Sequence, residues 1–273
     1  MVSDKKPRVL IPSGQGLNCE EETAFGYRKA GAEADIVHIN DVIGNPGMLE
    51  DYQILALIGG FTDGDHIASG RIHANRLRHG LWTQLMEFID KGKLVIGVCN
   101  GFQAMVKSGL LPSIGNRHEV GDMTLTYNDS GIFEDRWVDL AMEKNSKCIW
   151  TRGIENLSLP IRHGEGKMRL SHDGIMHELE SSGQIAMRYV DPRTGKVALE
   201  QDYPHNPNGS VGGVAGICDP SGRVFGMMPH WEGFMYPYSH PLWTRLNAEG
   251  RLLEGLGMRI ARNGVEYAME KLM

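Results

Sequence analysis

The first hundred residues alternate short apolar runs with helix-like amphipathic stretches, and this alternation limits the folds open to the chain. The apolar runs are RVLIP, ADIVHI, ILALIGG and KLVIGV, at residues 8–12, 34–39, 54–60 and 93–98. Before the last run, Leu77, Leu81, Leu85 and Phe88 recur near the helical spacing of 3.6 residues. Strands that are apolar throughout are typical of a parallel sheet whose two faces are both covered by helices.

The second half of the chain has a different pattern. From about residue 117 the segments MTLTY, RWVDLAM, KCIW and IAMRYV alternate apolar with polar residues, as half-exposed antiparallel strands do. AGICDPSGRVFGMMPH predicts a hairpin that turns at residues 219–222, and the tail from about residue 241 is predicted to be helical. We therefore expect a single α/β domain over residues 1–273, with a central, mostly parallel sheet, antiparallel strands in its second half and a helical C-terminal extension.

Composition argues against several classes of protein. A net charge of −6 is a poor basis for nucleic-acid binding, and 41% hydrophobic residues are ordinary for a globular chain. No apolar run approaches the ~20 residues that a membrane-spanning helix needs, and no signal-peptide core is expected at the N-terminus. The four cysteines are far apart and form no CxxC pair, which favours reduced thiols in the cytoplasm.

The stretch LVIGVCNGFQAM, at residues 94–105, carries the clearest chemical pattern. Gly97 to Gly101 read Gly-Val-Cys-Asn-Gly, the pattern of a nucleophile elbow with cysteine in the serine position. A side chain on such a strand-to-helix turn is exposed above the sheet, and the helix N-terminus favours a thiolate. The alternative is a buried cysteine that ends a core strand. The flanking glycines and the following helix favour Cys99 as a nucleophile.

A cysteine nucleophile needs a base, and the base needs an acceptor that orients it. His230 follows an apolar strand and Glu232 comes two residues later, so in an extended chain both side chains project to the same side. The pair Gly59-Gly60 ends another strand, so the N–H groups of Gly60 and Asn100 are predicted to form an oxyanion hole. The alternatives are a solvated His–Glu pair and an ordinary glycine turn.

Two other sequence features bear on different functions. GQGLNC, at residues 14–19, imitates a dinucleotide-binding turn, with Asp41 near the place of a ribose-binding acid. His66, His73 and His79 do not share one helical face, so no metal site is expected there. Cys99, His230 and Glu232 would also fit another cysteine amide hydrolase or an inactive regulatory relative, although an inactive relative would not need an intact Cys99.

Several motifs together resemble one known family. GVCNGFQ, GGFTDGD, PIRHGEGKM and NGSVGGVAGICDPSGRVFGMMPHWE, which span most of residues 8–232, are similar to the glutaminase subunits of phosphoribosylformylglycinamidine synthase. These are class I, or triad, glutamine amidotransferases. The resemblance implies a flavodoxin-like fold, with Cys99 as nucleophile and His230 and Glu232 as the rest of the triad. The chain differs from the family's usual Pro-Glu-Arg in having Trp231 and Gly233 beside Glu232.

The resemblance also implies what surrounds the triad. Gly60 and Asn100 would be the oxyanion donors and Gln103 a residue of the glutamine pocket. The polar segment PIRHGEGKM adds His163 and Glu165 as candidate substrate contacts. The alternative acceptor chemistry of another class I amidotransferase stays open.

The expected partners follow from the chemistry. The chain has no GxxxxGK[ST] phosphate loop, so it is expected to bind no cofactor itself and to leave ATP and Mg²⁺ to another chain. By resemblance that chain is a large synthetase subunit, accompanied in many systems by a small third subunit. The reaction would convert formylglycinamide ribonucleotide to the amidine with ammonia from glutamine, in de novo purine biosynthesis. No nucleic acid or membrane partner is expected.

Overall fold

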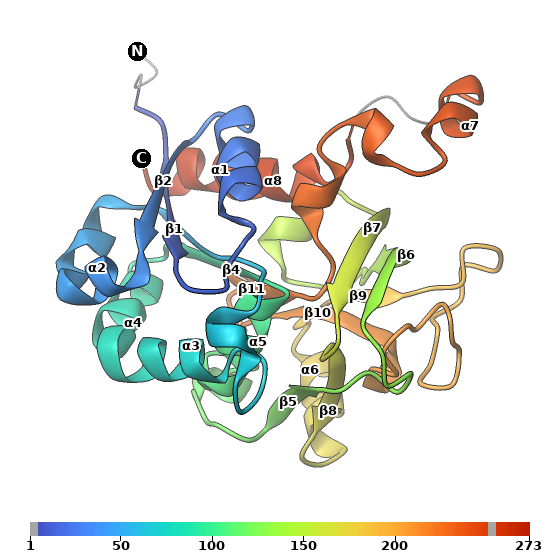
Figure 1. The fold of residues 1–273 in the computed structure, drawn as a ribbon, viewed down its shortest axis with the longest axis horizontal. Coiled ribbons are helices and arrows are strands. Elements are labelled where there is room, and N and C mark those ends of the chain that lie inside the picture. The colour runs from blue at the N-terminus through green and yellow to red at the C-terminus, as the bar shows by residue number, and fades with distance from the viewer. Residues whose placement is uncertain (1–4, 251–254) are drawn as a thin grey trace.

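A computed structural model describes residues 5–250 and 255–273 (Figure 1). In these residues the chain forms a nine-stranded sheet, ordered β2-β1-β3-β4-β11-β10-β9-β6-β7, and a separate β5–β8 pair. The strands are β1 (Arg8–Ser13), β2 (Glu33–His38), β3 (Ile54–Leu57), β4 (Leu94–Val98), β5 (Met123–Thr126), β6 (Glu134–Met142), β7 (Asn156–His163), β8 (Lys167–Leu170), β9 (Ile185–Tyr189), β10 (Val214–Cys218) and β11 (Val224–Met227).

The sheet has a parallel half and an antiparallel half. β2, β1, β3, β4 and β11 run parallel to one another, whereas β11, β10, β9, β6 and β7 pair antiparallel in that order. The expected mostly parallel α/β sheet with antiparallel additions is confirmed, and so is the hairpin of β10 and β11. Strand β4 lies in the middle of the sheet and is buried at every position, which explains its unbroken apolar sequence.

Helices cover both faces of the parallel half (Figure 1). α1 and α8 lie on one face, and α3, α4 and α5 lie on the other. The helices are α1 (Glu20–Lys29), α2 (Ile39–Gly44), α3 (Arg71–Arg76), α4 (Trp82–Asp90), α5 (Asn100–Lys107), α6 (Gly174–Ser181), α7 (Trp243–Ala248) and α8 (Met258–Lys271). No helix within the described ranges has both the length and the apolar content needed to cross a membrane.

The helix predicted from Leu77, Leu81, Leu85 and Phe88 is present, with these side chains buried, and it contains a π-helical turn at Leu77–Leu81 between α3 and α4. The predicted strand at residues 147–150 is wrong. Trp150 there is fully buried in a 3-10 turn, with its ring against Gly264 of α8 and its Nε1 donating to the Arg223 carbonyl.

The parallel strands bring distant parts of the sequence to one edge of the sheet. β1, β3, β4 and β11 all point the same way, so the loops that follow them meet at their carboxyl ends. These loops contain residues 14–19, residues 58–61, Cys99 and residues 228–232. This edge is therefore the place to look for a functional site.

His73 is a buried ionisable group away from that edge. Its ring is 1% exposed on α3, and neither ring nitrogen has a hydrogen-bond partner among the described residues. Burial, with a smaller effect from the charge of Arg76, lowers the pKa of His73 to about 4. The unfolded chain takes up this proton near pH 6.5, so the folded state loses stability as the pH falls below that value.

Replacing His73 with leucine is expected to flatten the acid side of the stability curve. Between pH 6.5 and 4 the histidine removes about 1.4 kcal/mol of stability per pH unit, because only the unfolded state is protonated there. Urea unfolding at several pH values measures this slope. The control is His79→Leu at an exposed position two residues before Leu81. If the free energy of unfolding fell equally with pH in the His73→Leu variant and the wild type, this acid sensitivity could not be assigned to His73.

Candidate functional site

Cys99 occupies a strained turn between β4 and α5. Its backbone has φ 50° and ψ −106°, a conformation that costs a non-glycine residue about 1–3 kcal/mol. A Cβ on Gly101 would lie 2.1 Å from the Leu57 carbonyl oxygen, so only glycine lets the helix start so close to β3. The Cys99 N–H donates to the Met227 carbonyl at 2.8 Å and ties the turn to β11. The nucleophile-elbow geometry expected from the sequence is present.

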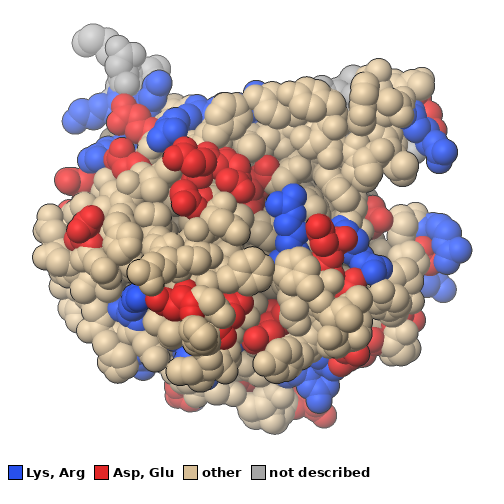
Figure 2. All heavy atoms as spheres, in the orientation of Figure 1, with Lys and Arg blue, Asp and Glu red and all other residues tan. Residues whose placement is uncertain are grey.

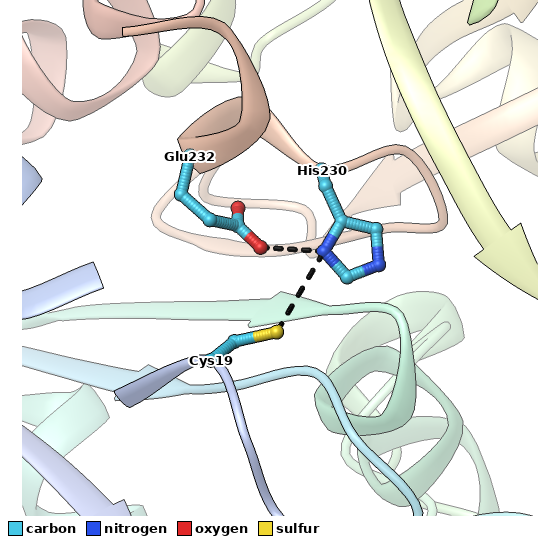
Figure 3. Close-up of side chains that lie close together, drawn as sticks. All are labelled: Cys19, His230 and Glu232. Carbon is cyan, nitrogen blue, oxygen red and sulfur yellow. Dashed lines mark hydrogen bonds and ion pairs between the residues drawn. The ribbon is translucent and has the colours of Figure 1, made fainter. Parts of the chain in front are cut away.

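His230 and Glu232 lie at the end of β11. The expected extended chain gives way to a 3-10 turn at Trp231–Phe234, but the carboxylate still reaches the ring. Glu232 Oε1 lies 2.5 Å from His230 Nδ1, and both side chains are 3% exposed. Figure 3 shows the carboxylate on the Nδ1 side of the ring, with Nε2 turned away from it. Glu232 can therefore accept a hydrogen bond from the Nδ1–H group and fix the orientation of the ring.

Opposing effects act on the pKa of His230. Burial lowers it, but the carboxylate of Glu232 and then the charge of Cys99 outweigh burial and raise the pKa well above its ordinary value. Cys99 and His230 both line one cavity. Nε2 nevertheless has no partner at hydrogen-bonding geometry among the described residues, and the Cys99 thiol itself donates to the Arg162 carbonyl at 3.5 Å. Catalytic hydrogen bonds are often this loose before substrate binds.

Within the described part of the chain, the N–H groups of the two predicted oxyanion donors, Gly60 and Asn100, have no hydrogen-bond partner. Leu17 and Gly60 form a bridge whose hydrogen bonds run from Phe61 to Gly16 and from Asn18 to Gly59, so the bridge does not use the Gly60 N–H. Asn100 is the first residue of α5, ahead of the first bond of that helix, which Gln103 donates to Cys99. This arrangement fits an oxyanion hole, and the role itself stays a prediction.

A cavity of about 300 Å³ opens at the carboxyl edge of the sheet. It brings together the segments that the sequence analysis singled out and several residues that it missed. Its walls are formed by Asn18, Cys19, Glu22, Gly60, Phe61, Cys99, Phe133, Arg162 and His230. The stretch that imitates a dinucleotide-binding turn is thus part of the Cys99 cavity and is bridged to Gly60.

The cavity carries both signs of charge. Glu22 belongs to the acidic first turn of α1, and Arg162 comes from the end of β7 with a half-exposed side chain. Figure 2 shows acidic residues gathered over α1 with basic residues next to them. Arg162 belongs to the polar PIRHGEGKM loop that was expected to face the substrate, but it was not among the predicted site residues, and neither was Glu22. Their places after a helix cap and within PIRHGEGKM were the available signals.

Gln103, His163 and Glu165 lie behind the cavity wall. Gln103 Nε2 donates to the Glu165 carbonyl at 2.5 Å, and its Oε1 accepts from Asn100 at 3.1 Å. The Glu165 carboxylate accepts from the Ser69 N–H and lies 3.8 Å from Lys107 Nζ. None of the three residues lines the Cys99 cavity. Their role as substrate contacts stays a prediction. Gln103 and, through it, Glu165 hold the Asn100 turn.

His163 is fully buried near the catalytic ring. Its Nδ1 lies 3.1 Å from Asn128 Oδ1, and burial together with the charge of His230 lowers the pKa of His163 to about 3. His163 is therefore neutral at neutral pH, and the neighbouring imidazolium is not faced by a second positive ring.

Cys19 approaches the same ring from the opposite loop. Its Sγ lies 4.0 Å from His230 Nδ1 (Figure 3). Burial raises the pKa of the Cys19 thiol to about 11. Cys19, His230 and Glu232 are the one group of potential metal ligands that clusters within the described part of the chain.

Comparisons with known proteins agree with this geometry. A family model described as a CobB/CobQ-like glutamine amidotransferase domain matches residues 6–268. The phosphoribosylformylglycinamidine synthase subunit PurQ of Dehalococcoides mccartyi is 42% identical over 97% of this chain and 99% of its own length. The Methanococcus maripaludis subunit of that name is 45% identical, over 96% and 97%. A chain of PurLQS from Thermotoga maritima superimposes with a TM-score of 0.70 at 27% identity, covering 96% of this chain and 99% of that one.

The two cavity cysteines are expected to react differently with iodoacetamide. The pKa of about 11 leaves roughly one Cys19 thiol in a thousand ionised at pH 8, whereas Cys99 lies at a helix N-terminus beside His230. Mass spectrometry of digested protein after brief labelling should find the modification on Cys99. Faster labelling of Cys19 than of Cys99 would contradict this assignment of the reactive thiol.

Proposed function

The chain belongs to the PurQ family of phosphoribosylformylglycinamidine synthase subunits, and we propose that it is the glutaminase of that synthase. It hydrolyses the side-chain amide of glutamine and supplies the ammonia from which the synthase makes an amidine in purine biosynthesis. The observation that carries the proposal is the convergence of Cys99, His230 and Glu232 on one cavity at the carboxyl edge of the sheet.

The first half of the reaction forms a thioester. The Cys99 thiolate attacks the side-chain carbonyl carbon of glutamine, and the negative oxygen is stabilised by the N–H groups of Gly60 and Asn100. The raised pKa of His230 keeps its ring protonated at neutral pH, so Nε2 can protonate the leaving nitrogen. The C–N bond breaks, ammonia leaves, and the glutamyl group stays on the Cys99 sulfur.

The second half returns the enzyme to its starting state. His230, now neutral, takes a proton from a water molecule that attacks the thioester carbonyl. The C–S bond breaks, glutamate leaves, and the thiolate–imidazolium pair forms again. Throughout, Glu232 holds the ring through Nδ1 and stabilises its positive form.

The charges of the cavity fit an amino-acid substrate. Glu22 is available for the α-ammonium group of glutamine and Arg162 for the α-carboxylate, while the amide extends toward Cys99. Gln103 and Glu165 support this pocket by fixing the Asn100 turn, and His163 is held by Asn128.

The partners follow from the family and the cavity mouth. The Thermotoga maritima relative was solved as part of PurLQS, which supports assembly of this chain with a large synthetase subunit and a small third subunit. Phe61 and Phe133 form an exposed aromatic pair at the mouth, with ring centroids 6.0 Å apart, which suits a protein partner. ATP and Mg²⁺ are assigned to the synthetase subunit, and this chain binds no cofactor for the reaction. The four free cysteines fit a reducing cytoplasm.

Replacing Cys99 with alanine is expected to reduce glutamate release by at least about a thousandfold, because it removes the thiol that is proposed to form the thioester. The assay uses the chain with the synthetase subunit, ATP and formylglycinamide ribonucleotide, and it is repeated with the chain alone. Circular dichroism checks the fold. Cys148→Ala, a buried cysteine far from the cavity lining, should retain the wild-type rate.

Two outcomes would overturn the proposal. Glutamate release by the Cys99→Ala variant at the wild-type rate would show that Cys99 is not the nucleophile. Turnover of another amide with none of glutamine would assign the chain to another cysteine amide hydrolase or to an amidotransferase with a different acceptor.

Glu232→Gln tests the electrostatics of the triad. In the wild type, the alkaline limb of kcat/KM is expected as the pH rises through the raised pKa of His230 and the ring loses its proton. Removing the carboxylate charge lowers that pKa, so the alkaline limb of the pH profile moves to lower pH and kcat falls about 10²-fold or more. Glu22→Gln removes a charge from the same cavity without touching Nδ1, and it should raise KM and leave the limb in place. An unmoved limb in Glu232→Gln would contradict this role.

A further inference from the structure

The Nδ1 side of His230 faces two donor groups, and the proposed reaction uses one of them. Glu232 Oε1 lies 2.5 Å from Nδ1 and Cys19 Sγ lies 4.0 Å from it. The sulfur, nitrogen and carboxylate oxygen are all within 4.8 Å of one another. In Figure 3 the three side chains come from two loops and point toward a common centre. Orientation of the ring by Glu232 does not require a thiol at this place.

The cluster is buried and incompletely satisfied. All three residues are buried, with whole-residue exposures of 5% for Cys19, 3% for His230 and 6% for Glu232. The second carboxylate oxygen, Glu232 Oε2, is buried with no hydrogen-bond partner among the described residues. A buried carboxylate oxygen without a partner is costly, and a cation bound beside it would remove that cost.

The backbone leaves room for the cluster. A Cβ on Gly59 would lie 2.7 Å from His230 Cε1 and 3.1 Å from Cys19 Sγ, so a side chain there would push the ring and the thiol apart. Cys19 and His230 also line the open cavity, which gives an ion a path to the cluster and gives a water molecule access to a fourth ligand position.

The donor set selects the kind of ion. A thiolate, an imidazole nitrogen and a carboxylate oxygen are zinc ligands, whereas Mg²⁺ and Ca²⁺ prefer oxygen alone. Tetrahedral zinc, with bonds of about 2.0–2.3 Å, places its ligand atoms about 3.2–3.6 Å apart. Cys19 Sγ would approach Nδ1 by about half an ångström, and the carboxylate would withdraw by somewhat more. Side-chain rotations of this size need no change of fold.

We propose that Cys19, His230 and Glu232 form a zinc site that switches the glutaminase off. On binding, zinc takes the Nδ1 lone pair, and the protons of Cys19 Sγ and His230 Nδ1 pass to solvent. Glu232 then ligates the ion and no longer accepts a hydrogen bond from Nδ1. The ring can no longer form the imidazolium that protonates the leaving nitrogen. The inhibition rests on the proposed function, whereas zinc binding stands on the geometry alone.

Binding is measured without reference to activity. In full-length Cys99→Ala protein the catalytic thiol is absent, so any thiolate ligand at this site must be Cys19. Calorimetry is expected to find one zinc ion per chain, and cobalt substitution should give a thiolate-to-metal charge-transfer band. The double variant Cys99→Ala/Cys19→Ala should lose the band. A band of unchanged strength in the double variant, or no binding to Cys99→Ala protein, would overturn the site.

Inhibition is measured on variants that keep Cys99. Each rate of glutamate release is divided by the same variant's rate without zinc, so that any effect of the substitution itself cancels. Cys19→Ala should require at least about tenfold more zinc for half-inhibition, since it removes a direct ligand. Cys148→Ala is the control and should match the wild type. Equal zinc sensitivity of Cys19→Ala and wild type would show that zinc acts through Cys99 and would overturn the switch. If no variant hydrolysed glutamine, the proposed function would fail, and the cobalt band would still decide the binding site.

Discussion

The parallel pairing of β4 with β3 on one side and β11 on the other is the constraint on which the site depends. It places the ends of three strands next to one another, and the Cys99 N–H bond to the Met227 carbonyl fixes the nucleophile turn to the strand that leads to His230. The left-handed backbone of Cys99 is held by this bond on one side and by the close approach of Gly101 to Leu57 on the other. The strained backbone of Cys99 is therefore held in place by the buried strands on either side of it.

Local patterns in the sequence predicted most of the buried strands, although not the turn at residues 147–150, and they did not reveal which distant segments pair. The apolar runs around Leu94 and Ile54 indicate buried strands because both faces of these strands are covered. The turn at Cys99 carries its own glycines. By contrast, Cys19 reaches His230 only because β1 and β11 lie in one sheet, and no short pattern marks this contact. The sequence pattern favoured His163 over its neighbour Arg162, because histidine is the more usual catalytic residue. In the structure the His163 side chain is buried in the interior.

The charges around the triad are arranged so that one buried ring can be positive. The carboxylate of Glu232 and the charge of Cys99 raise the pKa of His230 despite burial, whereas burial and the charge of His230 lower the pKa of His163. Two buried histidines in one region therefore have opposite pKa shifts, and the difference lies in their partners. Glu232, two residues after His230, is what favours the protonated form of that ring over that of His163.

The residues on either side of Glu232 are explained by packing. Trp231 is fully buried and meets Tyr27 edge to face at 5.4 Å, and Gly26 of α1 leaves space for its ring. A side chain on Gly233 would begin 2.4 Å from Pro160 in β7. The departures from the usual Pro-Glu-Arg sequence therefore fit this turn between α1 and β7. Because the 3-10 turn that they stabilise is what aims the carboxylate at Nδ1, changes at Trp231 should act on the reaction through the orientation of Glu232.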